Sequence, residues 1–325
     1  RNEFAFRRIY LGYDYNISQK FAVELLLAAE DNVVQGNNPP TGDLLSDGKL
    51  TFYIKLANIR WKNVWKGTDL VVGQMGTPTF SLLSERVWGY RSIERTITDI
   101  RRTPSFDFGA ALQGLFDSKG NYGYNIMVGN GTGAKPEGDN FKWFYADVFA
   151  KFLDKRLVFD LYADYERLTW ENGFHHARNM VKGFVAYTTP AFTAGVEAFV
   201  NKGKDDVVGV NGTVKDTLSA NALGISAYVH GNIVKDRLGY FARFDSYNPD
   251  TQYDNGRYTK YTGFTSNYEP NNKEQFITAG LDFTPVKNVH FMPNVWYNKY
   301  MSNTAVSNTS YDLVYRMTFY FVFGK

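Results

Sequence analysis

The chain has 325 residues, of which 17% are aromatic, yet its mean hydropathy is −0.36. A chain that is rich in aromatic residues but polar overall is unusual for a soluble core and typical of a transmembrane β-barrel, which has aromatic girdles and a polar lumen. The formal net charge of +3 is too small to indicate a nucleic-acid partner, and the absence of cysteine excludes disulfides and thiolate metal sites. The longest purely apolar run, 25–29, is too short for a transmembrane helix.

Alternation of apolar and polar residues predicts fifteen β-strands, because successive side chains of a strand point to opposite faces. In the clearest case, 157–167, Leu161 belongs to an apolar face, whereas Asp160, Asp164 and Glu166 belong to the other face. Three carboxylates on one face require water, so we expect that face to line a polar lumen. The expected strands are 4–15, 21–30, 49–60, 68–76, 106–116, 122–130, 141–152, 157–167, 179–188, 192–201, 218–231, 237–247, 274–284, 289–299 and 312–325.

Short connections between these strands alternate with long ones. The first turn, 16–20, is short, whereas 31–48, 202–217 and 248–273 are long and polar. This alternation is typical of outer-membrane barrels, which have short periplasmic turns and long external loops, and a soluble sandwich does not require it. We therefore predict that residues 1–325 form a single all-β domain, a transmembrane antiparallel β-barrel.

The direction of the first strand indicates how many strands the barrel has. Because the first connection, 16–20, belongs to the short periplasmic class, the first expected strand runs inward from the outside. Bacterial single-chain barrels have even strand numbers. We therefore expect a barrel of sixteen strands, with fifteen visible in this chain and the first strand missing before Arg1. The alternative is a miscounted hairpin in 248–273, where 257–264 could be extended.

Four segments carry short motifs: RRIYLG at 7–12, VGQMGTP at 72–78, SIER at 92–95 followed by Asp99, and PNVWYNK at 293–299. They resemble the opening, a strand with its following loop, and the penultimate strand of the phosphate-selective porin family (porin O and P type). The resemblance implies a trimeric, sixteen-stranded porin of Gram-negative bacteria with a loop folded into the lumen. The aromatic loading and the Asn- and Tyr-rich loops resemble the Bacteroidetes branch. The binding loop of phosphate-specific members is denser in cations, so phosphate specificity is not carried over.

The longest expected connection, 77–105, is the candidate functional segment, because a loop this long usually has a role beyond joining strands. Folded into the lumen, it would form a constriction and place guanidinium groups on the path of anions, which arginine and lysine rings favour. In the alternative interpretation, its arginines pair with Glu85, Glu94 and Asp99 and hold the segment against the wall. The candidate residues for the constriction and the anion path are Arg86, Arg91, Arg95, Arg101, Arg102, Glu94, Arg8, Lys55 and Arg243.

These patterns predict passive diffusion of small anionic or neutral hydrophilic solutes across the bacterial outer membrane. The anion preference should be mild, because acids are interleaved with the basic residues. The expected partners are outer-membrane lipid, lipopolysaccharide and, from the resemblance, two further copies in a homotrimer. We expect no cofactor, no metal, no nucleic acid and no enzymatic activity, since no Ser–His pair marks a catalytic site. The alternative function is that of a structural barrel subunit in a larger outer-membrane complex, with partner proteins and a plugged lumen.

Overall fold

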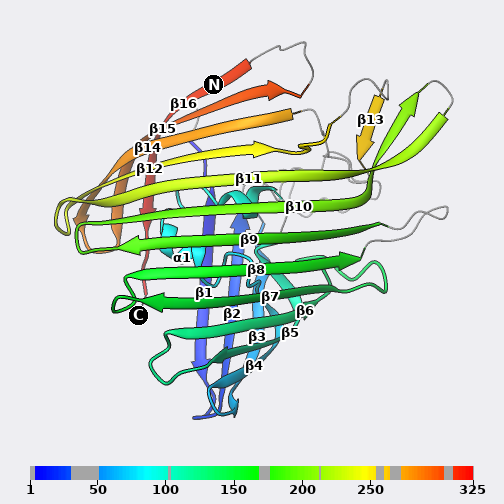
Figure 1. The fold of residues 1–325 in the computed structure, drawn as a ribbon. Helices are drawn as coiled ribbons and strands as arrows, with labels where there is room; N and C mark the ends of the chain where they lie inside the picture. Colours follow the sequence, from blue (N-terminus) through cyan, green and yellow to red (C-terminus); the bar gives the residue numbers. More distant parts are fainter. Residues whose placement is uncertain are drawn as a thin grey trace.

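The computed structural model describes residues 4–30, 51–101, 104–167, 176–211, 214–253, 260–263, 272–303 and 310–324. Fifteen strands form one antiparallel sheet in which each strand pairs with the next along the chain, and the sheet curves into a barrel wall (Figure 1). The predicted transmembrane β-barrel is therefore confirmed. The strands of the wall are β1 (Arg8–Asn16), β2 (Phe21–Glu30), β3 (Tyr53–Trp65), β4 (Thr68–Gly76), β5 (Phe106–Leu115), β6 (Tyr122–Gly129), β7 (Trp143–Phe152), β8 (Leu157–Arg167), β9 (Ala177–Thr188), β10 (Phe192–Asn211), β11 (Val214–Val234), β12 (Leu238–Asn248), β14 (Asn272–Val286), β15 (Val289–Ser302) and β16 (Ser310–Phe321).

The two faces of the wall differ as the alternation predicts. In β8, the side chain of Leu161 is 56% exposed on the outside, whereas its neighbour Asp160 is 4% exposed on the inside. Apolar side chains that face outward form a belt of the kind that lipid requires. Members of this belt are Phe108, Ile126, Phe144, Val148, Phe159, Val181, Val196, Ile225, Ile277 and Leu281.

The inward face of β8 differs from expectation in one respect, because its carboxylates are buried instead of solvated. Asp160 and Asp164 are 4% and 7% exposed. Asp164 accepts hydrogen bonds from the hydroxyl of Tyr162 and from the backbone N–H of Met180. Alternation placed these side chains on the correct face, but protein groups inside the barrel take the place of the expected water.

The first and last strands of the order, β1 and β16, run in the same direction, because every neighbouring pair between them is antiparallel and the path has fifteen strands. Within the described residues, β1 pairs only with β2, and β16 pairs only with β15. An antiparallel barrel closes with an even number of strands. The sixteenth strand expected before Arg1 lies outside the described residues and stays a prediction.

The predicted long loop at 202–217 is wrong, because the two strands beside it continue through most of this range. β10 reaches Asn211 and β11 begins at Val214, and these two residues are paired. A short strand, β13 (Lys260–Gly263), pairs with the end of β10 instead of entering the wall, so the alternative hairpin in 248–273 does not add a wall strand. Figure 1 shows this extension beyond the rest of the wall. The Asn-Gly pair at 211–212 is a strong hairpin signal that could have revealed it.

Two short helices, α1 (Ser84–Trp88) and α2 (Ile97–Arg101), lie in the long connection between β4 and β5. Figure 1 shows α1 within the curve of the sheet. Trp88, Ile93 and Ile97 of this connection are almost fully buried and belong to two apolar clusters with inward side chains of the wall. The core of the protein therefore lies inside the barrel, between this connection and β4–β12. Neither helix is long and apolar enough to cross a membrane.

Candidate functional site

The 77–105 segment leaves the sheet at the end of β4 and returns at the start of β5. Its two ends are tied together, since the backbone N–H of Thr77 donates to the carbonyl of Ser105 at 3.2 Å. The hydroxyl of Thr77 also donates to the carbonyl of Pro104 at 2.8 Å. The segment is thus a loop whose two ends are hydrogen-bonded to each other at the edge of the sheet.

A buried lysine of the wall joins the 77–105 segment to three neighbouring strands. Lys182 of β9 is fully buried, and its Nζ lies 3.0 Å from an oxygen of Asp160 in β8 and 3.7 Å from one of Glu197 in β10. The same Nζ donates to the hydroxyl of Ser84 at 3.4 Å, and the hydroxyl of Thr98 donates to Glu197 at 2.6 Å. Two carboxylates and one ammonium group thus anchor both α1 and α2.

Aromatic side chains form a second anchor on the next strands of the sheet, β11 and β12. The ring of Trp88 lies 5.0 Å from that of Tyr228 and 6.5 Å from that of Phe241, centroid to centroid. Tyr90 also contacts Phe241, at 4.7 Å, and its hydroxyl donates to Asp282 at 3.2 Å. Burial of large aromatic groups supplies much apolar area, so this cluster fixes the tip of α1 against β11 and β12.

Two of the predicted wall cations, Arg8 and Arg243, bind the backbone of the 77–105 segment. Arg8 donates to the carbonyl of Arg91 at 2.8 Å, and Arg243 donates to the carbonyl of Arg95 at 2.5 Å. Arg243 is 3% exposed and also makes a paired, two-point contact with Asp245. Both cations therefore hold the segment, and the charge of Arg243 is neutralised within the wall.

The third predicted wall cation, Lys55 of β3, is neutralised by Glu30 of β2. Its Nζ forms an ion pair with Glu30, and it donates to the hydroxyl of Tyr10 at 3.1 Å. That hydroxyl donates in turn to Glu30 at 2.7 Å. Lys55 is 6% exposed, so its charge reaches a passing ion only weakly.

Within the 77–105 segment, Arg91 and Arg95 pair with acids of the same segment. Arg91 binds the carboxylate of Glu85 and lies 2.6 Å from Asp99. Arg95 lies 3.8 Å from the same Asp99. For these two residues the geometry is that of the alternative interpretation, in which arginines hold the segment together.

The remaining predicted arginines of the loop differ in whether an acid neutralises them. Arg101 makes a two-point contact with the carboxylate of Glu274 in β14. Arg86 is exposed and, among the described residues, only the carbonyl of Ser81 accepts a hydrogen bond from it, at 3.3 Å. Arg102 lies outside the described residues. Arg86 is thus the loop arginine whose charge is least compensated by nearby acids.

The acids of the 77–105 segment differ in how readily they bind protons. Burial raises the pKa of Glu85, and the adjacent Asp99 raises it further, whereas Arg91 opposes both effects. Burial also acts to raise the pKa of Glu94, but the pKa is lowered overall because Arg7 pairs with this carboxylate at 2.7 Å. As the pH falls, Glu85 therefore loses its charge before Glu94 does.

Acidification should strengthen the anion preference of the pore. Protonation of Glu85 leaves Arg91 with one charged acid partner fewer, so the local potential becomes more positive. We expect the anion-to-cation permeability ratio to rise as the pH falls from 7 through the raised pKa of Glu85, and Glu85→Gln should flatten the upper part of this rise. Reversal potentials across a salt gradient measure the ratio. A ratio that falls on acidification, or an unaltered pH profile in Glu85→Gln, would contradict this assignment.

Two cavities lie on either side of the 77–105 segment. The first, of about 520 Å³, lies against β1–β4, and we call it the basic cavity because five cations and three acids line it. The second, of about 380 Å³, lies against β12 and β14–β16, and we call it the amphipathic cavity. The charged residues of the basic cavity are Lys55, Arg60, Lys62, Arg86, Arg91, Asp14, Glu24 and Glu85.

Sequence reasoning missed several residues of this arrangement. Lys182 is the clearest case, because its acid partners come from two other strands and become visible only once the register is known. Arg60 and Lys62 of β3 line the basic cavity together with Lys55, although strict alternation from Lys55 puts them on the other face; an irregularity in the β2–β3 register explains the change. Among the described residues, no group of three or more His, Asp and Glu side chains could hold a metal ion.

Comparison with known proteins shows the class of fold. No protein-family model matches the chain, and no curated protein sequence matches it. The outer membrane channel DcaP of Acinetobacter baumannii is 12% identical, with a TM-score of 0.64 over 96% of this chain and 84% of that one. The anion-selective porin from Comamonas acidovorans is 11% identical, with a TM-score of 0.61 over 97% and 89%. OmpF of Salmonella typhi, solved with daunomycin, is 10% identical, with a TM-score of 0.57 over 97% and 89%. The chain therefore has the fold of outer-membrane β-barrel channels.

Proposed function

We propose that this protein is a porin of the bacterial outer membrane through which small hydrophilic solutes diffuse passively, with a mild preference for anions. The observation that carries the proposal is the contrast between the two sides of the wall. Outside is a belt of exposed apolar side chains, and inside are two cavities with charged linings, separated by the 77–105 segment. That segment acts as the constriction of the pore.

The anion preference rests on the basic cavity. Several cations of its lining are paired with acids, Lys55 with Glu30 and Arg60 with Asp69, whereas Arg86 contributes a charge that no acid among the described residues pairs with. Coulomb interactions are stronger in a narrow, partly desolvated passage than in bulk water, so the unpaired charge of Arg86 acts on passing ions. The predicted role of Arg86 in the anion path is supported by this geometry, whereas Arg91, Arg95 and Arg101 are better explained as anchors.

Neutralising Arg86 should reduce anion selectivity. In Arg86→Gln we expect the anion-to-cation permeability ratio to fall about two- to fourfold at ~0.1 M salt or below, with a smaller change at 1 M. The matched control is the double variant Arg101→Gln with Glu274→Gln, because it removes both members of an ion pair, keeps the net charge and should leave the ratio unchanged. Reversal potentials of the reconstituted channel in planar bilayers measure both variants.

The same recordings test the proposal as a whole. A barrel that inserts without conducting, or a wild-type channel that prefers cations at neutral pH, would show that the protein is not an anion-preferring porin. An equal loss of selectivity in Arg86→Gln and in the double variant Arg101→Gln with Glu274→Gln would remove the special role of Arg86. Channel activity without any substrate turnover would agree with the expectation that the protein is not an enzyme.

The finer expectations stay predictions. These are the phosphate-selective type, the homotrimer and the contact with lipopolysaccharide. The outward apolar belt supports contact with outer-membrane lipid. The 77–105 segment fills part of the lumen, as a plugged structural subunit would require, but the similar solved structures are channels and porins, which favours the porin over this alternative.

A further inference from the structure

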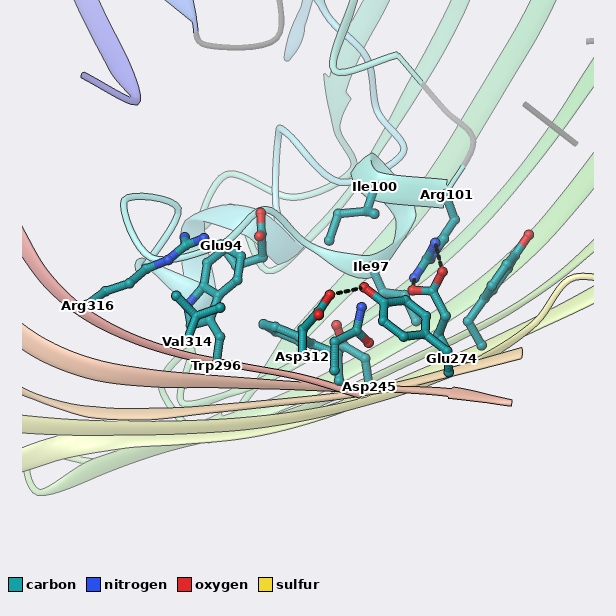
Figure 2. Close-up of a pocket in the computed structure, with 14 residues that line it drawn as sticks. Glu94, Ile97, Ile100, Arg101, Asp245, Glu274, Trp296, Asp312, Val314 and Arg316 are labelled. Atoms are coloured by element: carbon teal, nitrogen blue, oxygen red, sulfur yellow. Dashed lines mark hydrogen bonds and ion pairs between the residues drawn. The ribbon is translucent and has the colours of Figure 1, made fainter. Parts of the chain in front are cut away.

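The amphipathic cavity differs from the basic cavity in its chemistry. One side is formed by Ile97 and Ile100 of α2, and the other side by residues of the wall, as Figure 2 shows. Its volume of about 380 Å³ falls within the range of pockets that hold small molecules, roughly 300–1,000 Å³, and such pockets are often found inside β-barrels. Its place beside the 77–105 segment puts it on the route of any solute that passes the constriction.

The acids of this cavity already have partners. Glu274 is held by Arg101, and Asp245 makes a two-point contact with Arg243. Asp312 accepts a hydrogen bond from a tyrosine hydroxyl, that of Tyr300, at 2.8 Å (Figure 2). Glu94, at the other end of the cavity, is paired with Arg7. Three of these acids are paired with arginines, and the remaining negative charge of Asp312 is balanced in sum by the positive charge of Arg316 in the same lining, so the cavity offers little net attraction to a charged solute.

What the cavity does offer is apolar surface edged by hydrogen-bonding groups. Ile100 and Val314 present aliphatic faces, and the guanidinium carbon of Arg316 lies over the indole of Trp296, 3.5 Å from the ring centroid. Hydroxyl, carboxylate, amide and guanidinium groups stand around these faces and include both donors and acceptors. The matching chemistry is a molecule with apolar C–H faces and an edge of hydroxyl groups.

We propose that the amphipathic cavity is a weak binding subsite for neutral polyhydroxylated solutes of the size of a mono- or disaccharide. The inference rests on the proposed channel function and gives it a solute class. Apolar contact with Ile100 and Val314 orients the sugar face, and the acids of the cavity accept hydrogen bonds from its hydroxyl groups. Binding in a pore must be weak enough for release, so the dissociation constant falls in the millimolar range or above.

The test is sugar block of the ion current through single wild-type channels in planar bilayers. Adding maltose should reduce the current along a saturating curve, whereas a poly(ethylene glycol) of similar size should reduce it only in proportion to concentration. In Ile100→Ser and in Tyr300→Phe the half-blocking maltose concentration should rise about three- to tenfold, the effect of losing one apolar contact or hydrogen bond. Lys62→Ser, in the basic cavity, is the matched control and should leave maltose block unchanged.

Several outcomes would overturn the subsite. These are a linear dependence on maltose, half-block at the same concentration in both variants as in wild type, or tighter block by glutamate or lysine than by maltose. In each of these cases normal ion conductance would leave the proposed channel function standing, whereas absence of conductance would remove the channel function itself. If Ile100→Ser fails to insert, Tyr300→Phe carries the test, since it deletes one hydroxyl and keeps the ring.

Discussion

Replacing Lys182 with methionine is expected to lower the free energy of unfolding by about 3–5 kcal/mol, the usual cost of breaking a buried charge pair by removing one partner. The side chain is fully buried, and its ammonium group is the cation shared by Asp160 and Glu197. Without it, Asp160 has no ion-pair partner among the described residues, and Glu197 keeps only the longer-range attraction of Arg243. Because Lys182 also contacts Ser84, the 77–105 segment should loosen, and open-channel current should become noisier.

A charge-neutral rescue separates the ion pair from simple packing. Adding Asp160→Asn and Glu197→Gln to Lys182→Met removes the uncompensated charges, so most of the lost stability should return. Reversible unfolding in lipid vesicles with increasing urea gives the free energies. If the triple variant is as unstable as Lys182→Met, loss of packing explains the effect, and the buried charges are not what stabilises this region.

For Asp160, the sequence and the structure lead to different expectations about folding. As a lumen-facing carboxylate in water, it should tolerate Asp160→Asn with intact folding. In the structure its carboxylate is the closer ion-pair partner of Lys182, so Asp160→Asn alone should destabilise the barrel measurably. The lumen face was predicted correctly, but the 77–105 segment turns part of that face into an interior.

Arginine at position 161 should impair folding by about 2–4 kcal/mol, which is the cost of placing Arg on the lipid face near the bilayer midplane. Leu161 is the central outward residue of β8 and is 56% exposed, and it lies between the outward Val148 of β7 and Gly183 of β9. No inward group can reach a guanidinium placed there. The fraction of folded, heat-modifiable barrel after refolding into vesicles measures the effect.

A matched control uses the depth dependence of this cost. Leu157 begins β8 beside the short turn, on the same outward face, where an arginine can extend to the interface and should cost only about 0–1 kcal/mol. Equal folding yields for Leu157→Arg and Leu161→Arg would mean that the midpoint of β8 does not lie at the membrane midplane. Wild-type folding of Leu161→Arg would contradict the lipid-facing assignment itself.

Most of the fold could be predicted from the alternation of apolar and polar residues, because this alternation is a local property of the chain. Residues two apart share a face regardless of what surrounds them, so the apolar outer face of β8 could be predicted from its own eleven residues. The same local rule failed at 202–217, where polar and charged residues continue the strands beyond the apolar belt. A strand that extends beyond the lipid no longer needs an apolar face, so the alternation of polarity no longer shows where the strand ends.

The sequence by itself determined the barrel, the outward apolar face and the length of the 77–105 segment. Only the tertiary structure decided what the charges of this segment do. Arg91 pairs within the segment, Arg101 pairs with a distant strand, and Arg86 alone of the described loop arginines lacks an acid partner. Ion pairing depends on distances between residues far apart in the chain, such as Arg101 and Glu274. Strand register and the path of the segment set those distances, and neither follows from local alternation.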